Sequence, residues 1–285
     1  MTMFTIACVQ TNSKVNPSEN IAEVSAMIRE AKAGGADLIA TPEVVGMMAA
    51  RRKDAIQLAR PEESHEVLAA FRNLAAKLSA WLLIGSISIK VSEEQLLNRS
   101  FLVGPDGGIV ARYSKIHMFD VQVGDGKPYR ESHTYKPGEE AVLAETPWCT
   151  MGLTICYDLR FPYLYRDLAQ AGAKVIFIPA AFTKVTGEAH WHVLQRARAI
   201  ENGCYIIAPA QTGTHDGGRE TYGHSVVVAP WGEIIADGGT EVGVTLAEID
   251  LGEVDIARGK VPSLSHDRPY SSPAFQDERL RAVGD

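Results

Sequence analysis

Short apolar runs alternate with longer amphipathic segments along most of the chain. Short apolar runs bounded by turn residues are typical of buried strands, whereas the segments between them have the periodicity of helices that pack on one face. Strands are expected at residues 4–9, 37–40, 81–89, 151–155, 174–178, 204–208, 225–229 and 244–249. Helices are expected at residues 17–33, 62–79, 163–171 and 188–201. This order predicts a layered α/β protein.

One pattern occurs twice, as FLVGPDGGIVA at residues 101–111 and as VVVAPWGEIIA at residues 226–236. In each copy an apolar strand is interrupted by a Pro-x-Gly turn and then resumes, which predicts a β-hairpin. Equivalent hairpins in the two halves indicate two similar sheets packed together with helices outside, rather than one doubly wound sheet. Because no linker separates the halves, we expect a single domain over residues 1–285. The polar segment 262–285 is expected to be a C-terminal arm, either wrapped on the surface or partly disordered.

Composition limits the partners of this protein. Of its 285 residues, 46% are hydrophobic and 22% are charged, a balance typical of a globular protein with a large core. The 28 Lys and Arg against 35 Asp and Glu give a formal net charge of -7, which repels phosphate backbones and anionic lipids. Nucleic acid and membranes are therefore not expected as partners. With no apolar run near bilayer length and no signal-peptide pattern, a cytoplasmic protein is predicted.

The four cysteines are too few and too scattered for a disulfide framework or a paired zinc site. Cys8 and Cys204 lie within apolar strands and are expected to be buried. Cys156 instead closes the apolar run 151–155 and opens a polar turn before a helix. A thiol there is expected to be exposed enough to react, with a pKa lowered by nearby backbone N–H groups. Position alone leaves a structural thiol as the alternative.

Two other strand ends carry charged residues, Glu43 after the strand at 37–40 and Lys115 after the strand that ends near residue 111. Taken singly, each is better interpreted as a solvated side chain. Spacing alone gives no reason to bring either of them close to Cys156.

Three sequence blocks give such a reason: TPEVVG around Glu43, SKIHMFD around Lys115 and GLTICYDLRFP around Cys156. They resemble, in the same order, the three catalytic blocks of the carbon–nitrogen hydrolase (nitrilase) superfamily. A papain-like protease is disfavoured, because the chain has no Cys-Gly-x-Cys-Trp run. The resemblance implies a four-layer α-β-β-α sandwich, in agreement with the two predicted sheets. It also implies a homodimer or higher homo-oligomer, in which C-terminal segments are exchanged.

The resemblance further implies roles for individual residues. Cys156 would be the nucleophile that forms a thioester, and Glu43 would be the general base and acid. Lys115 would favour the thiolate and hold the oxyanion together with the backbone N–H of Tyr157. Glu131 matches a second glutamate of many members, which positions the substrate or relays protons; a loop carboxylate paired with Arg130 or a lysine is the alternative.

The residues after Cys156, YDLRFP at 157–162, resemble the amidase-like Nit branch rather than true nitrilases or N-carbamoyl amino acid hydrolases. The segments 179–183, 186–191 and 196–201 resemble the same branch, and the loop 215–219 resembles its members that act on deaminated glutathione. The resemblance implies hydrolysis of a primary amide in a small carboxylate-bearing substrate, of the deaminated glutathione or 2-oxoglutaramate type, with release of ammonia. The alternatives are an N-carbamoyl amino acid hydrolase, a short-chain aliphatic amidase, and a catalytically silent binding or scaffold protein.

Substrate contacts are expected from Tyr157, Phe182, Thr183, His190 and Arg219, with Arg219 binding a distal carboxylate. For His190, packing of a helix is an equal alternative. His190 and His192 are two residues apart and point to different helix faces, so they do not form a metal-binding pair. Neither a metal nor an organic cofactor is expected.

Overall fold

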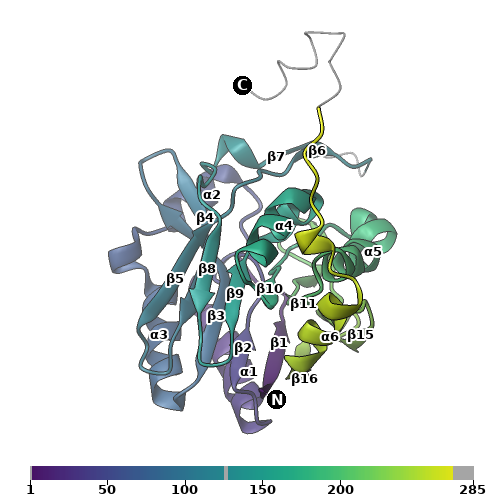
Figure 1. Ribbon diagram of the computed structural model, residues 1–285. Coiled ribbons are helices and arrows are strands. Elements are labelled where there is room, and N and C mark those ends of the chain that lie inside the picture. The colour runs from purple at the N-terminus through teal and green to yellow at the C-terminus, as the bar shows by residue number, and fades with distance from the viewer. Residues whose placement is uncertain (1, 125–127, 272–285) are drawn as a thin grey trace.

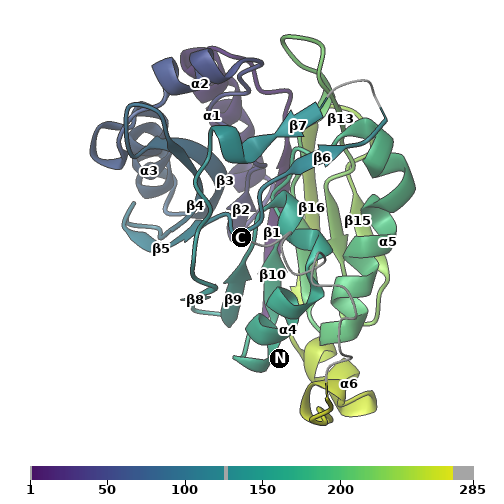
Figure 2. The same cartoon turned by 90° about the horizontal axis from the view of Figure 1, so that it is seen from above.

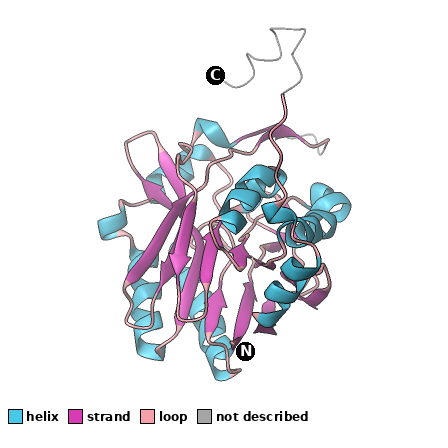
Figure 3. Cartoon of the chain, in the orientation of Figure 1, coloured by secondary structure: helices cyan, strands magenta, loops and turns pink. Residues whose placement is uncertain are grey.

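The computed structural model describes residues 2–124 and 128–271, which form two six-stranded sheets (Figures 1 and 3). The first sheet has the order β16 (Gly243–Asp250), β1 (Met3–Gln10), β2 (Leu38–Ala40), β3 (Trp81–Lys90), β4 (Leu96–Val103), β5 (Ile109–Ser114). The second has the order β8 (Val142–Glu145), β9 (Thr150–Leu153), β10 (Val175–Phe177), β11 (Tyr205–Ala208), β14 (Val226–Val228), β15 (Ile234–Asp237).

Both sheets have the same pairing pattern. Three parallel strands, β1–β2–β3 in one sheet and β9–β10–β11 in the other, are flanked by antiparallel neighbours. Each sheet ends in a predicted hairpin, β4–β5 in the first and β14–β15 in the second. The repeated Pro-x-Gly pattern therefore predicted both hairpins and the equivalence of the two sheets correctly.

Alternating side chains give the sheets two covered faces. On β1, Ile6 and Cys8 contribute to the core between the sheets, whereas Ala7 and Val9 face a second core under the outer helices. Helices α1 (Pro17–Ala33) and α3 (Glu66–Leu78) cover the first sheet, and α4 (Pro162–Gln170) and α5 (Lys184–Asn202) cover the second (Figure 2). These layers confirm the predicted four-layer α-β-β-α sandwich.

The long elements match their predicted positions, whereas several short ones were not predicted. The predicted helix 62–79 is divided into η1 (Glu62–Ser64) and α3, and α5 begins four residues before the predicted start. The strands of the small hairpins are three residues long and are not apolar, so they show neither a period of two nor an apolar run and had no sequence signal. The elements without a prediction include α2 (Arg52–Leu58), β6 (Asp120–Gln122), β7 (Pro128–Arg130), η2 (Glu131–His133), η3 (Cys156–Arg160), β12 (Thr212–Thr214), β13 (Glu220–Tyr222), α6 (Gly252–Lys260) and η4 (Ser263–Ser265).

The first part of the predicted C-terminal arm lies against α4. Arg166 donates to the carbonyl of Ser263 at 2.8 Å and pairs with Asp267, and Gln170 donates to the carbonyl of Leu264 at 2.8 Å. The remainder of the arm, residues 272–285, lies outside the described residues. Among the helices that are described, none is both long and apolar enough to cross a bilayer.

Candidate active site

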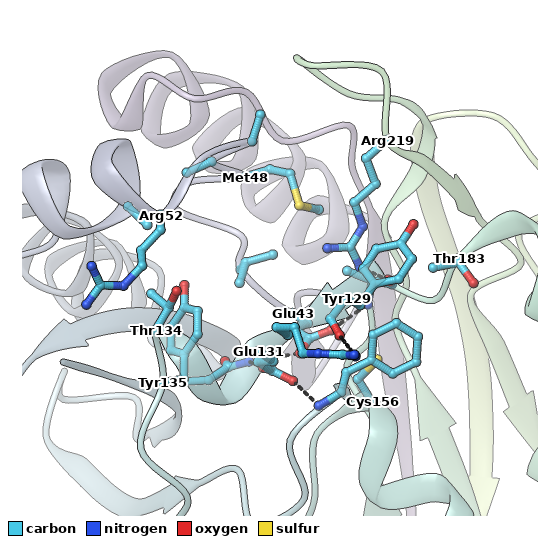
Figure 4. A pocket seen from close by; sticks show the side chains of 18 of the residues that line it. Glu43, Met48, Arg52, Tyr129, Glu131, Thr134, Tyr135, Cys156, Thr183 and Arg219 are labelled. Carbon is cyan, nitrogen blue, oxygen red and sulfur yellow. Dashed lines mark hydrogen bonds between the residues drawn. The ribbon is translucent and has the colours of Figure 1, made fainter. Parts of the chain in front are cut away.

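A pocket of about 250 Å³ opens where strand ends of both sheets meet (Figure 4). Its lining includes the four predicted catalytic residues, Glu43, Lys115, Glu131 and Cys156. The structure therefore brings together side chains that sequence spacing alone could not connect.

Glu43 lies in the turn that follows β2, and close packing of this turn on β3 holds it in place. A Cβ atom at Gly85 would lie only 1.9 Å from the carbonyl oxygen of Thr41, so only glycine allows this approach. The side chain is 6% exposed, and its Oε2 accepts a hydrogen bond from the N–H of Ala181 at 2.8 Å. The interpretation of Glu43 as a solvated side chain is therefore wrong.

Lys115 follows β5 and is 2% exposed, so it is not a solvated side chain either. Its Nζ lies 3.0 Å from Oε1 of Glu43 and 2.8 Å from Oε2 of Glu131. Asn98 on β4 joins this group, because its Nδ2 donates to Oε1 of Glu43 at 2.9 Å and to Oε1 of Glu131 at 3.3 Å. The ammonium thus links two carboxylates that a neighbouring amide also orients.

Sequence reasoning missed Asn98 and the role of Asp158. Asn98 had only a weak signal, because it is one of three consecutive polar residues between the apolar ends of the segment 96–103. Asp158 is fully buried and supports the turn that carries the thiol. Its carboxylate accepts from the N–H of Ile155 at 2.8 Å and from the hydroxyl of Tyr113 at 2.7 Å.

Cys156 begins η3 in a left-handed backbone conformation, with φ of 48°. This region is uncommon for residues other than glycine, and surrounding contacts must hold the backbone there. The N–H of Cys156 donates to the carbonyl of Pro179 at 3.0 Å, and the N–H of Asp158 donates to the carbonyl of Ile155 at 3.1 Å. The N–H of Tyr157 lies between these two at the start of η3, where helical N–H groups have no intrahelical acceptor.

Burial and charge determine the protonation of this cluster. Burial raises the pKa of the Cys156 thiol and the Glu43 carboxylate raises it further, so that it lies well above its ordinary value although Lys115 lowers it. Burial disfavours the charged Lys115 ammonium, but Glu131 and Glu43 outweigh this effect and raise its pKa well above its ordinary value. Burial also disfavours the Glu43 carboxylate, yet Lys115 lowers its pKa overall.

The expected exposed thiol with a lowered pKa is therefore wrong. Cys156 is 6% exposed, and two carboxylates surround the single ammonium beside it. A thiolate would add a further negative charge beside Glu43 in a buried site, which is unfavourable. The directions of these shifts favour a neutral thiol beside an ionised glutamate.

Three of the predicted substrate contacts, Phe182, Thr183 and Arg219, line the pocket, and two do not. The ring of Tyr157 packs edge-on against Phe119 and Phe161 instead.

His190 is exposed and lies 3.2 Å from a guanidinium nitrogen of Arg160. Thr183 and Thr186, at the start of α5, reach the pocket. Because each residue adds about 1.5 Å along a helix, His190 lies roughly a turn further away. His190 is thus not among the residues that line the pocket, and its contact with the substrate stays a prediction.

Arg219 brings a positive charge to the pocket from the segment that connects β12 and β13. Its guanidinium donates to the carbonyl of Ala181 at 2.7 Å and lies 5.7 Å from the ring centre of Tyr129. Its buried Nε has no hydrogen-bond partner among the described residues. Arg51, Arg52 and Arg130 also line this pocket, and Met47, Met48 and Ala55 form an apolar part of its wall.

Known proteins with similar sequences agree with the catalytic group seen in the pocket. The sequence model of the family described as "Carbon-nitrogen hydrolase" matches residues 5–258. A deaminated glutathione amidase of Synechocystis sp. is 40% identical over 273 residues, which cover 93% of this chain and 98% of the relative. The deaminated glutathione amidase of Mus musculus is 39% identical over 271 residues, covering 93% and 83%.

Solved structures with a similar fold include proteins of the same kind. The Caenorhabditis elegans NitFhit protein superposes with a TM-score of 0.88 at 36% identity, covering 94% of this chain and 66% of that one. A carbon–nitrogen hydrolase from Helicobacter pylori superposes with a TM-score of 0.83 at 25% identity, covering 94% and 96%.

Proposed function

This chain belongs to the carbon–nitrogen hydrolase family, and from that premise we propose that Cys156 cleaves an amide bond of a small carboxylate-bearing substrate. The enzyme is a hydrolase that acts on carbon–nitrogen bonds other than peptide bonds. The observation that carries the proposal is the buried contact of Cys156 with the Glu43–Lys115–Glu131 group in a pocket that also contains Arg219.

The chemistry begins with the neutral thiol beside the ionised Glu43. The sulfur attacks the amide carbon while Glu43 accepts the thiol proton, so the site does not need to hold a separate thiolate. Charge then develops on the carbonyl oxygen, where Lys115 and the N–H of Tyr157 act as donors. Glu131 pairs with Lys115 and orients it.

The tetrahedral intermediate collapses when the C–N bond breaks and Glu43 returns the proton to the leaving nitrogen. The acyl group remains on Cys156 as a thioester. Glu43 then removes a proton from water, and the resulting hydroxide attacks the thioester. The carboxylic acid leaves, and the proton returns to the sulfur. Nucleophilic catalysis thus divides one difficult cleavage into two easier steps.

The arginines of the pocket support a substrate with a carboxylate, since guanidinium groups bind carboxylates in bidentate geometry. The relatives named deaminated glutathione amidase direct the choice to that substrate type, with 2-oxoglutaramate as the smaller candidate. The leaving group differs between the two. Glutathione contains only secondary amides, so cleavage of its deaminated form releases an amine, whereas 2-oxoglutaramate releases ammonia from a primary amide. The expected primary amide and release of ammonia therefore apply to 2-oxoglutaramate and not to deaminated glutathione.

A substrate panel tests this proposal. Purified enzyme is assayed with deaminated glutathione, 2-oxoglutaramate, a neutral short-chain amide, a nitrile and an N-carbamoyl amino acid, with ammonia and free amine measured separately. We expect the two carboxylate-bearing amides to give the highest kcat/KM. Faster turnover of the nitrile or the carbamoyl compound would contradict the substrate class. Binding without turnover of any compound would favour the scaffold alternative.

We also propose that the protein forms a homo-oligomer through its outer helices. Val185, Val193 and Ile200 on α5 are all exposed, and their spacing of seven to eight residues places them on one helix face. An exposed apolar stripe of this kind is typical of a surface that another subunit covers. Light scattering on wild type and on Val193→Glu tests this, because a charge in the stripe should shift the mass to that of a monomer.

A further inference from the structure

Two histidines and an aspartate meet at the end of β15, on residues that the proposed reaction does not use. His192 lies on α5, His224 lies between β13 and β14, and Asp237 is the last residue of β15. Nε2 of His192 is 3.0 Å from Oδ2 of Asp237, and Nδ1 of His224 is 2.9 Å from Oδ1 of the same carboxylate. One ligand atom from each residue lies within 4.8 Å of the others.

The two histidine–aspartate distances are close to those required by a metal ion, and the two histidine nitrogens, which lie within 4.8 Å of each other, have to approach more closely. Zinc binds imidazole nitrogen and carboxylate oxygen at about 2.0–2.2 Å, so neighbouring ligand atoms of a tetrahedral site are roughly 3.3 Å apart. The two histidine–aspartate distances need to change by only a few tenths of an ångström to reach this value. The rings of His192 and His224 are 5.0 Å apart at 77°, so their edges converge on the carboxylate from different directions.

The surrounding contacts orient two of these side chains. His224 has φ of 55°, a conformation uncommon for this residue type, and its N–H donates to the carbonyl of Gly239 at 2.6 Å. Its ring stacks on Tyr222 with centres 4.5 Å apart, and its carbonyl accepts from the indole N–H of Trp191 at 2.8 Å. The N–H of Gly239 also donates to Asp237 at 2.9 Å. Such supporting contacts fix the orientation of metal ligands in known sites.

We propose that His192, His224 and Asp237 bind one divalent transition-metal ion of the zinc class, with a water molecule as the fourth ligand. Two imidazoles and one carboxylate are a ligand set that suits zinc and its neighbours rather than calcium or magnesium. The side chains are 28%, 23% and 32% exposed, which leaves a path for the ion and its water. The ion fastens α5 to the β14–β15 hairpin, and its role is structural.

Sequence spacing could not reveal this group. His190 contacts Arg160, whereas the partners of His192 come from segments 32 and 45 residues further along the chain. Only the packing of α5 on the second sheet brings them together.

The test is metal binding by the full-length protein without an affinity tag. The protein is stripped with a chelator and titrated with Zn²⁺ by calorimetry, beside His192→Ala, Asp237→Asn and the control His190→Ala. His190 lies on the same helix, two residues from His192 and outside the cluster. We expect one equivalent in wild type and in His190→Ala, and loss of that equivalent in the other two variants. Equal zinc binding by all four proteins would overturn the proposal, as would the absence of a stoichiometric equivalent in wild type.

A second measurement separates this site from the cysteines and from misfolding. Cobalt is titrated into wild type and into Cys156→Ala, and its visible absorption is followed. The proposal predicts the same tetrahedral spectrum in both, without sulfur-to-cobalt charge transfer, and a higher Tm on metal addition in wild type but not in His192→Ala. Before metal is added, Cys156→Ala and His192→Ala should both have the circular dichroism spectrum of wild type. A signal that disappears in Cys156→Ala would show that the ion binds the thiol and would overturn the proposal.

Discussion

The two sheets have the same pairing pattern but use their strand ends differently. The end of β5 leads to Lys115, which is buried against two carboxylates, whereas the equivalent strand β15 ends at Asp237 in a partly exposed group with two histidines. The end of β2 leads to Glu43, and the equivalent strand β10 leads to Ala181, whose N–H binds that glutamate. Equivalent strands therefore place charged residues at equivalent ends of the two sheets. Burial then determines whether such a residue is shielded from water, as Lys115 is, or partly solvated, as Asp237 is.

The proposed nucleophile, Cys156, also lies beyond the end of a strand at a site where both sheets meet. β9 leads to Cys156 at the edge where both sheets contribute, and Cys149 lies at the opposite end of this strand. Both thiols have a raised pKa, because burial disfavours the thiolate at each end. What distinguishes Cys156 is its contact with Glu43 and Lys115 rather than its acidity. We call the strand ends that carry Glu43, Lys115 and Cys156 the reactive edge. The following predictions compare substitutions at this edge with substitutions elsewhere in the fold.

The largest effect is expected for Cys156→Ala, which should abolish amide hydrolysis because no other group can form the thioester. Folding should be retained, since alanine fits the space of the buried thiol. Steady-state assays and circular dichroism measure the two properties, and wild type with substrate should show a transient thioester mass on the Cys156 peptide. Cys149→Ala, at the other end of β9, is the control and should keep wild-type turnover. Activity in Cys156→Ala would end the proposed mechanism.

Lys115→Ala should reduce kcat by at least the 10²- to 10³-fold that is roughly typical of losing one oxyanion donor. The loss should be greater than that, because the two carboxylates would lose their common partner. Lys115→Arg should not restore turnover, since a planar guanidinium is wider than a point donor and crowds the tetrahedral centre. Lys174→Ala, which removes a partly exposed lysine just before β10, is the control. Near-normal turnover of Lys115→Arg would show that Lys115 contributes only its positive charge and is not a specific oxyanion donor.

Arg219→Ala tests the pocket away from the reacting atoms. A charge-assisted hydrogen bond contributes about 1.5–3 kcal/mol, so its loss should raise KM for a carboxylate-bearing amide roughly tenfold to more than a hundredfold. A neutral short-chain amide, measured on the same preparation, should be much less affected, and kcat should change little for either. Equal effects on both substrates would instead indicate that Arg219 acts through its bond to the carbonyl of Ala181.

Sequence patterns predicted the arrangement of the fold better than the environment of the site. Periodicity placed the long strands and α1, and the repeated hairpin predicted two equivalent sheets, because both signals are local. The resemblance selected Glu43, Lys115 and Cys156. The sequence could not show that Asn98 binds both glutamates or that Asp158 binds Tyr113, since these contacts join segments that are far apart in the chain. Burial of the thiol among two carboxylates also depends on how the sheets pack, and a strand-end position does not determine it.

The smallest expected effect is on the alkylation rate of the Cys156 thiol in the enzyme without substrate. This rate distinguishes the lowered pKa expected from the sequence from the raised pKa indicated by the structure. A lowered pKa would leave Cys156 largely ionised near neutral pH. With a raised pKa, the thiolate fraction is small near neutral pH and increases about tenfold for each unit by which the pH rises toward the pKa. Because burial and Glu43 raise this pKa, alkylation of Cys156 by iodoacetamide should be slow near about pH 7 and should rise without a plateau to about pH 9. Mass spectrometry of the Cys156 peptide gives this rate separately from those of the other cysteines.

Two variants show which neighbour controls the thiol. Removing the carboxylate charge in Glu43→Gln should lower the pKa of Cys156 and move the rise of the alkylation rate to lower pH, because Glu43 raises that pKa. Removing the ammonium in Lys115→Ala should slow it, because Lys115 lowers that pKa. A plateau below about pH 8 in wild type would mean that backbone N–H groups at the start of η3 outweigh burial. The reactive edge would then activate its thiol before substrate binds, and proton transfer to Glu43 would not accompany the attack.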